Sequence, residues 1–85
     1  MKIIYSSKFC KNYKKLNLSI KKTAEQNEKI FINNPFDNRL RTHKLKGRLE
    51  NYWSFSIGYK YRIVFRFIDQ ITVFFVTVGK HDIYN

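Results

Sequence analysis

The chain has few of the residues that would cross-link it, interrupt it or give it negative charge. Of its 85 residues, one is cysteine, one is proline, three are glycine and six are Asp or Glu. A single cysteine, Cys10, excludes an intrachain disulfide and a cysteine-rich zinc site. Two histidines with so few carboxylates also give little basis for any other metal site. We therefore expect no metal and no cofactor.

Long apolar runs are missing as well. The longest, Ile71 to Val78, contains two threonines and is far shorter than the roughly 20 residues that span a bilayer. The N-terminal segment is interrupted by lysines and has no apolar core of the kind found in signal peptides. We expect a cytoplasmic protein that does not enter a membrane.

Positive charge and aromatic rings are abundant. The chain carries 17 Lys and Arg residues, a formal net charge of +11, and 18% of its residues are aromatic. A disordered basic tail would be poor in aromatic residues, so we expect residues 1–85 to fold as a single domain. An excess of basic residues is typical of proteins that bind a polyanion such as nucleic acid.

The hydrophobic spacing of the first part predicts a strand followed by two helices. Lys2 to Tyr5 is apolar and partly β-branched, as in a short strand. Helical spacing follows, with Ser6 or Ser7 available as the first N-cap and Ser19 as the second. The apolar residues at this spacing are Phe9, Tyr13, Leu16, Ile20, Ala24, Ile30 and Phe31. Asn33-Asn34-Pro35 ends the second helix, and the short link predicts an antiparallel helical hairpin.

The second part reads as a sheet. After a polar, basic connection from Pro35 to Glu50, with Gly47 as its turn, the apolar period becomes two. We expect strands over 52–57, 61–67 and 71–78, the last a central strand because it is apolar on both sides. The fold class is α+β, with the order β-α-α-β-β-β and the helical hairpin on one face of a small, mainly antiparallel twisted sheet. The residues expected to face the helices are Trp53, Phe55, Ile57, Tyr61, Ile63, Phe65 and Phe67.

The same alternation places Arg62 and Arg66 on the open face of the sheet. The preceding segment, Arg39 to Arg48, has six basic or histidine residues in ten and no acidic one. Both features have an ordinary explanation, a solvated strand face and a solvated loop. A guanidinium group also binds phosphate in a bidentate manner, with two N–H groups on two oxygens, so we expect contacts with an RNA backbone here. The candidate RNA-binding residues are Arg39, Arg41, Lys44, Lys46, Arg48 and Arg66.

Cleavage of RNA without a metal requires a base for the 2′-OH, an acid for the leaving oxygen and a cation for the charge on phosphorus. His43, His81 and Arg62 meet these requirements if the basic segment and the C-terminal tail converge on the open face. Otherwise the chain is a basic binding module with incidental histidines. Three tyrosines are candidates for stacking on a base: Tyr52, Tyr59 and Tyr84.

Four short motifs follow one another in the second half of the chain: Leu45-Lys46-Gly47, Trp53-Ser54, Tyr61-Arg62-Ile63-Val64-Phe65 and Gly79-x-His81. In this order they resemble the RelE/ParE superfamily of bacterial and archaeal toxins, and within it the YafQ and YoeB branch of messenger-RNA interferases. The first half agrees in pattern only, with a strand, two helices and an Asn-Pro-Phe stretch at Asn34 to Phe36.

The resemblance implies a metal-independent endoribonuclease that cuts messenger RNA, usually in the ribosomal A site, with the 2′-OH as nucleophile. His43 stands where similar toxins carry a general base, and Arg62 matches the arginine that stabilises the scissile phosphate. His81 matches the general acid, and Tyr84 resembles a terminal ring that orients the substrate, one residue away from the commoner spacing. The phosphate-binding lysines of RelE-like members are matched loosely by Lys44 and Lys46.

The resemblance also implies partners: messenger RNA, the ribosome and an antitoxin. The antitoxin is expected to be a small acidic protein encoded beside the toxin, which wraps the toxin and blocks its site. Two alternatives stay open. One is a ParE-like poison of DNA gyrase that hydrolyses nothing, against which the two histidines argue. The other is a non-catalytic RNA-binding module.

Overall fold

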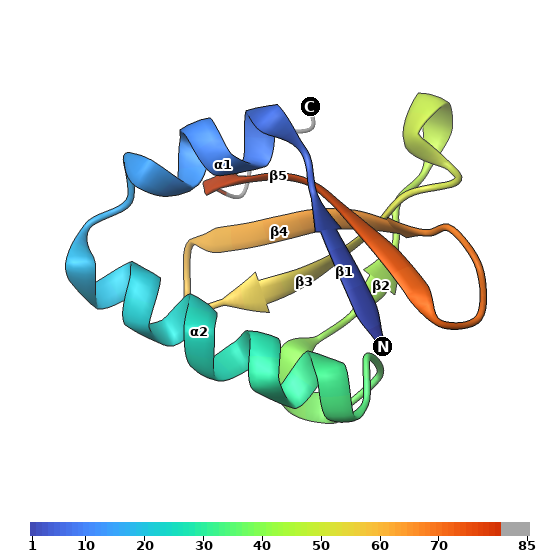
Figure 1. Ribbon diagram of the computed structural model, residues 1–85, viewed down its shortest axis with the longest axis horizontal. Coiled ribbons are helices and arrows are strands. Elements are labelled where there is room, and N and C mark those ends of the chain that lie inside the picture. The colour runs from blue at the N-terminus through green and yellow to red at the C-terminus, as the bar shows by residue number, and fades with distance from the viewer. Residues whose placement is uncertain (81–85) are drawn as a thin grey trace.

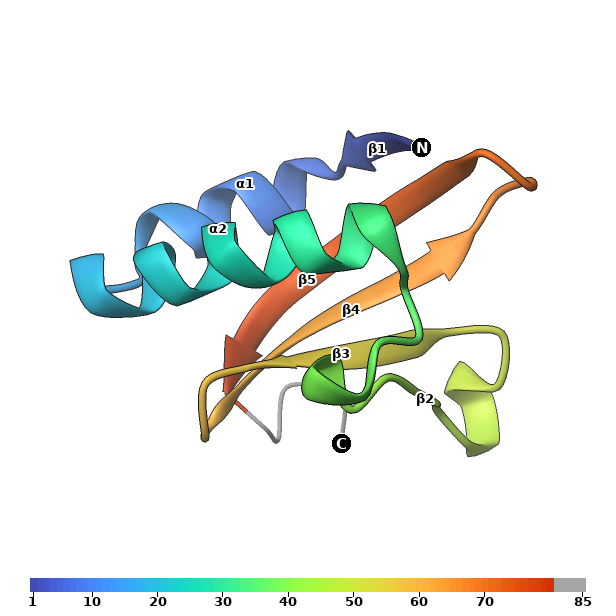
Figure 2. The ribbon, with the colours of Figure 1, turned by 90° about the horizontal axis from the view of Figure 1, so that it is seen from below.

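The computed structural model describes residues 1–80. Its elements, in chain order, are β1 (Lys2–Tyr5), α1 (Ser7–Lys14), α2 (Leu18–Asn33), the 3₁₀ turn η1 (Asn38–Leu40), β2 (His43–Lys44), the 3₁₀ turn η2 (Gly47–Leu49), β3 (Trp53–Ile57), β4 (Tyr61–Phe67) and β5 (Thr72–Lys80). Figure 2 shows the two α-helices side by side on one side of the sheet. The predicted α+β class and the helical hairpin are confirmed.

The five strands form one mixed sheet in the order β1-β5-β4-β3-β2 (Figure 1). β1 runs parallel to β5, and the other neighbours are antiparallel. β5 lies between β1 and β4, as its apolar faces predicted. β2 is an addition, because the segment that contains it was expected to be a loop. Two residues are too few to show a hydrophobic period, so the sequence gives no sign of this strand.

Side-chain caps fix where the helices begin. The Ser6 hydroxyl accepts a hydrogen bond from the Phe9 N–H at 2.8 Å, so the first predicted cap is correct. The second prediction is wrong, since Asn17 and not Ser19 caps α2. The Asn17 side-chain oxygen accepts from the Ile20 N–H at 2.9 Å, and its extended backbone, with ψ 164°, suits an N-cap.

An aromatic core lies between the helices and the sheet. Phe31, from α2, is fully buried. Its ring centroid lies 4.7 Å from that of Phe55, 4.9 Å from that of Phe65 and 5.5 Å from that of Phe75. Burial of large rings dominates the hydrophobic stabilisation of a small core. This single helix residue therefore holds α2 against three successive strands of the sheet.

The predicted inward face of the sheet is confirmed with one exception. Phe55, Ile57, Ile63 and Phe65 belong to the core, and Trp53 and Tyr61 pack against it. Phe67 was expected to be buried but is 37% exposed. It is the last residue of β4, beside the turn into β5. Its ring packs on those of Phe36, Trp53 and Phe65 there.

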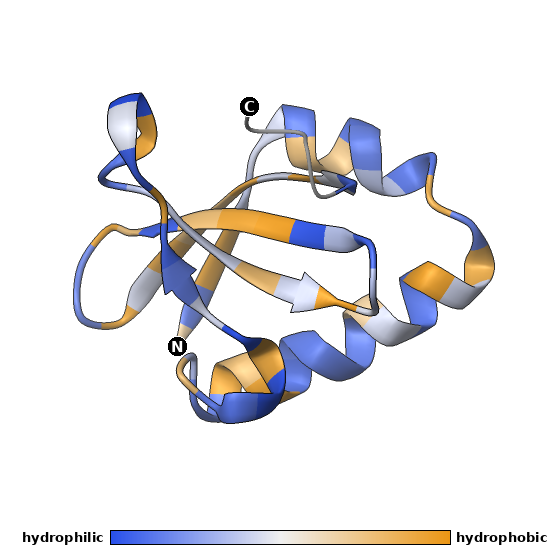
Figure 3. Ribbon diagram, turned by 180° about the vertical axis from the view of Figure 1, so that it is seen from behind, coloured by the Kyte–Doolittle hydropathy of each residue, from blue (hydrophilic) through white to orange (hydrophobic). Residues whose placement is uncertain are grey.

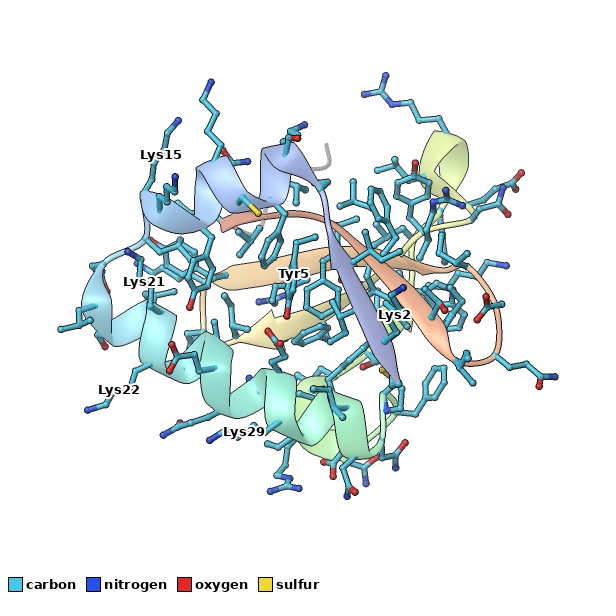
Figure 4. All side chains as sticks on the ribbon, viewed as in Figure 1. Lys2, Tyr5, Lys15, Lys21, Lys22 and Lys29 are labelled. Carbon is cyan, nitrogen blue, oxygen red and sulfur yellow. The ribbon has the colours of Figure 1, made fainter. Side chains whose placement is uncertain are left out.

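The outer surface of the helices carries much of the positive charge. Lys15, Lys22 and Lys29 extend away from the body of the protein (Figure 4). No helix within residues 1–80 has the length and apolar character needed to cross a membrane.

Candidate functional site

The register of three strands places His43 and Arg62 on one face of the sheet. His43 pairs with Ser54, Ser54 pairs with Val64, and Ser56 pairs with Arg62. Paired residues of antiparallel strands project to the same side, as do alternate residues of one strand. All five side chains therefore leave the sheet on the side opposite the helices, the side that Figure 3 turns toward the viewer.

The spacing between these two residues suits one phosphodiester group. His43 lies on β2 and Arg62 on β4, two strands apart. Across the sheet His43 is level with Val64, which is two residues along β4 from Arg62. Strand spacing and rise per residue then separate their Cα atoms by roughly 12 Å. An imidazole and a guanidinium that extend from these positions can approach a phosphodiester from two sides.

His43 is exposed, and its ring is held by the backbone. Its Nδ1 lies 3.1 Å from the carbonyl oxygen of Arg41. Because a carbonyl oxygen only accepts hydrogen bonds, this contact places the proton of the neutral ring on Nδ1. Nε2 then carries a lone pair, the form that a general base requires.

The backbone at Arg41 produces this contact. Arg41 ends η1 in the left-handed conformation, with φ 52° and ψ 41°. A residue with a Cβ adopts this region at an energetic cost. The turn aims the Arg41 carbonyl at the His43 ring, so the strain is found beside the candidate base.

Arg62 is half-buried and also anchored by backbone carbonyls. Its Nη1 donates to the carbonyl oxygens of Tyr61, at 2.9 Å, and Tyr59, at 3.4 Å. Both carbonyls lie at the turn between β3 and β4. One nitrogen of the fork is thereby fixed, while Nη2 and Nε make no hydrogen bond within residues 1–80. A fixed guanidinium with unused donors is suited to bind phosphate oxygens.

Arg62 further lines a cavity of about 320 Å³ together with Arg39 and Arg41. Arg39 is paired with Asp37, whose carboxylate oxygens lie 3.0 Å from Nε and 2.9 Å from Nη2. These hydrogen bonds lower the pKa of Asp37 from its ordinary value to about 2. Two of the three guanidinium groups therefore have no carboxylate partner in the described part of the chain. The other lining residues are Asn27, Ser56, Gly58 and Tyr59.

Two predicted RNA-binding residues lie away from this group. Lys44 pairs with Trp53, so its side chain leaves the sheet on the side opposite to His43. Arg66 shares the face of Arg62 but lies roughly 13 Å farther along β4, with its guanidinium 5.6 Å from the Phe74 ring centroid. Lys46 and Arg48 are exposed in the segment after β2.

The predicted acid and the predicted terminal ring, His81 and Tyr84, lie outside the described residues. β5 is described as far as Lys80, and its Gly79 pairs with Arg62. The described chain thus ends at Lys80, one residue after the Gly79 that pairs with Arg62. Of the other stacking candidates, Tyr59 is 96% exposed beside the cavity.

Two residues of this region were not predicted. Asn27 donates from Nδ2 to the carbonyl of Ser56 at 2.7 Å, which ties α2 to the edge of β3. The sequence does mark Asn27, because it is a polar residue within the apolar stripe of a helix, between Ala24 and Phe31. Ser54 is fully buried, and its hydroxyl has no hydrogen-bond partner among the described residues. Residues 1–80 contain no cluster of three or more His, Cys, Asp or Glu residues suited to a metal ion.

Similar folds occur among solved toxin structures. The YoeB/ParE toxin from Agrobacterium tumefaciens superposes with a TM-score of 0.80 at 19% identity, over 95% of this chain and 99% of that one. The YoeB dimer from Staphylococcus aureus gives 0.78 at 21%, over 95% and 97%. YafQ from E. coli strain BL21(DE3) gives 0.73 at 20%, over 93% and 91%. At these identities the likeness establishes the fold.

The sequence itself matches a family model over nearly its whole length, although no curated protein sequence matches it. The model is that of the ParE toxin of type II toxin–antitoxin systems, parDE, and it covers residues 3–83. The RelE/ParE superfamily predicted from the motifs is thereby confirmed. This chain belongs to the ParE toxin family of type II toxin–antitoxin systems.

Proposed function

We propose that this toxin is a metal-independent endoribonuclease that cuts messenger RNA on the ribosome. The observation that carries the proposal is the strand register that sets His43 and Arg62 on one face of the sheet, opposite the helices, in a strongly basic protein. The fold shared with YoeB and YafQ supports it. Because messenger RNA and ribosomes are found in the cytoplasm, the proposed activity belongs there.

The reaction uses the substrate's own 2′-OH as nucleophile. Nε2 of His43 accepts the hydroxyl proton as O2′ attacks phosphorus, and Arg62 stabilises the charge that develops on the non-bridging oxygens. The bond to the leaving 5′-oxygen breaks, and that oxygen takes a proton from an acid, a role we assign to His81. The products are a 2′,3′-cyclic phosphate and a 5′-hydroxyl.

A reconstituted translation reaction tests the proposal. Wild-type toxin is expected to cut ribosome-bound messenger at sites that primer extension can map. His43→Ala and Arg62→Ala are expected to lose this cutting, while Lys22→Ala, which removes an exposed charge on the helical side, retains it. An intact messenger with wild-type toxin contradicts the proposal.

The partner we propose is an acidic antitoxin encoded beside the toxin. Two neighbours of the same fold were solved as complexes, YoeB with YefM from S. aureus and YafQ with DinJ from E. coli. A net charge of +11 favours an acidic segment as strongly as RNA. Antitoxin and RNA would then compete for the same basic face.

A second candidate function follows from the family model, which describes ParE toxins. ParE-like members poison DNA gyrase and need no proton-transfer groups. In that case exposed cells show gyrase-dependent DNA breaks with intact messenger, and His43→Ala stays fully toxic. The exposed imidazole of His43, on the same face of the sheet as Arg62, favours the ribonuclease.

A further inference from the structure

The cavity lined by Arg39, Arg41 and Arg62 lies at an edge of the sheet, beside the row that contains His43. Within residues 1–80, β2 pairs with Trp53 and Ser54 alone, so the rest of β3 has no neighbouring strand on that side in this part of the chain. Asn27 from α2 binds the Ser56 carbonyl at this edge, which closes one wall of the cavity. The space is therefore built by four separate elements, α2, η1, β3 and β4, and by the β3–β4 turn.

The charge of the cavity suits a phosphate group. Asp37 balances Arg39 through two hydrogen bonds. Arg41 and Arg62 contribute two further positive charges, and none of the described residues that line the cavity is acidic. Paired guanidinium groups bind phosphate oxygens through several charge-assisted hydrogen bonds.

The cavity also offers contacts for a base. The Tyr59 ring is 96% exposed, so it contributes little to the core and presents a face to any ligand beside it. Exposed aromatic rings of this kind bind single-stranded RNA by stacking. Asn27, which lines the cavity, donates from Nδ2 to the Ser56 carbonyl, and its Oδ1 is an acceptor not used in that bond.

Arg62 connects this cavity to the proposed cleavage site, because its guanidinium lines the cavity and leaves the sheet on the same face as His43. We propose that the cavity is a second nucleotide subsite, which binds the nucleotide next to the scissile bond. Its phosphate lies between Arg41 and Arg62, and its base stacks on Tyr59. This inference rests on the proposed ribonuclease function.

Arg41→Gly is the sharpest variant with which to test the subsite. Glycine adopts the left-handed backbone of position 41 without strain, so the turn and the carbonyl that holds His43 are kept. The side chain is lost together with its guanidinium. Arg41→Asn, which also tolerates this conformation, repeats the test with a side chain present. Tyr59→Ala removes the ring from an exposed turn, and Lys22→Ala is the matched charge control.

The probe is a single-stranded trinucleotide with 2′-deoxy sugars, an analogue of RNA that lacks the 2′-OH nucleophile and cannot be cut. It is titrated into isotope-labelled toxin, and binding is followed by NMR. We expect Arg41→Gly, Arg41→Asn and Tyr59→Ala each to weaken binding by about tenfold, with the largest wild-type shifts at Asn27, Ser56 and Gly58. Lys22→Ala should match wild type. Unchanged binding in the Arg41 and Tyr59 variants overturns the subsite.

The same titration separates this inference from the ribonuclease proposal. Binding that depends on Arg41 and Tyr59, in a protein that leaves ribosome-bound messenger intact, supports the subsite and rejects the cleavage. Cutting of messenger, with no trinucleotide-induced NMR shifts at the cavity, supports the ribonuclease and rejects the subsite. If an acidic peptide binds through Arg41 while the trinucleotide does not, the cavity is a protein-docking site and the nucleotide subsite is wrong.

Discussion

The Nδ1 atom of His43 lies 3.1 Å from the carbonyl oxygen of Arg41, two residues earlier in the chain. This contact sets the tautomer of the neutral imidazole, and the carbonyl belongs to a residue with a left-handed backbone. The position of this candidate base is therefore set by a turn that precedes β2, while the position of Arg62 is set by a strand in the middle of the sheet.

His43→Ala is expected to lower the single-turnover rate of messenger cleavage by about 10² to 10⁴-fold, because it removes the proton acceptor. RNA affinity should change little, since the other basic residues of this strongly basic protein still attract the phosphate backbone. Gel quantification of the cut messenger and a binding titration measure the two effects separately. A cleavage rate close to wild type would exclude His43 as the base.

Arg62→Lys is expected to lower the cleavage rate by about 10²-fold or more, although the positive charge is kept. An ammonium group cannot donate to the Tyr61 carbonyl and at the same time present a planar fork to phosphate. Lys22→Arg, a charge-preserving exchange on the helical side, is the control. If Arg62→Lys cleaves like wild type, charge alone and not fork geometry is needed at this position.

Phe31→Ala is expected to lower the free energy of unfolding by about 3–5 kcal/mol, since it opens a cavity at the centre of the core. Leu18→Ala is the control, because Leu18 is 81% exposed on the same helix and should cost about 0.5 kcal/mol or less. Urea denaturation measures both. Equal effects would show that Phe31 does not hold α2 to the sheet.

The ion pair of Asp37 and Arg39 predicts a pH-dependent contribution to stability. The pKa of Asp37 in the folded protein is about 2, below its ordinary value of 3.8, so folding favours the ionised carboxylate. Its contribution is fully present above the ordinary pKa and is lost as the pH falls toward about 2. The Tm of wild type should exceed that of Asp37→Asn near neutral pH, and the difference should close in acid.

Arg39→Gln provides the matched test of that pair, because it removes the principal cause of the pKa shift while the carboxylate stays. In the Arg39→Gln background, Asp37→Asn should change the dependence of Tm on pH in acid much less than it does in the wild-type background. A full acid dependence in that background would show that Arg39 does not cause it.

Much of the fold follows from hydrophobic period and local capping. Alternation along 61–67 placed Arg62 opposite the helices, and the two-sided apolar run identified β5 as central. The N-cap of α2 was misplaced because Asn17 and Ser19 are both good capping residues, and only the backbone conformation distinguishes them.

The site was less accessible to sequence reasoning. His43 and Arg62 could be named as candidates, but their common face depends on the pairing of β2 with β3 and of β3 with β4. Such register is fixed by contacts between distant residues. The part that Asn27 plays in the cavity likewise depends on how α2 packs against the edge of β3.

The chemistry of the cut ends tests the central claim most directly. Ribosome-bound messenger is treated with toxin in the presence of EDTA, and the termini are identified by mass spectrometry. The proposed mechanism predicts a 2′,3′-cyclic phosphate on the upstream fragment and a 5′-hydroxyl on the downstream one, both absent with His43→Ala. An uncut messenger, or downstream fragments that carry a 5′-phosphate, would contradict it.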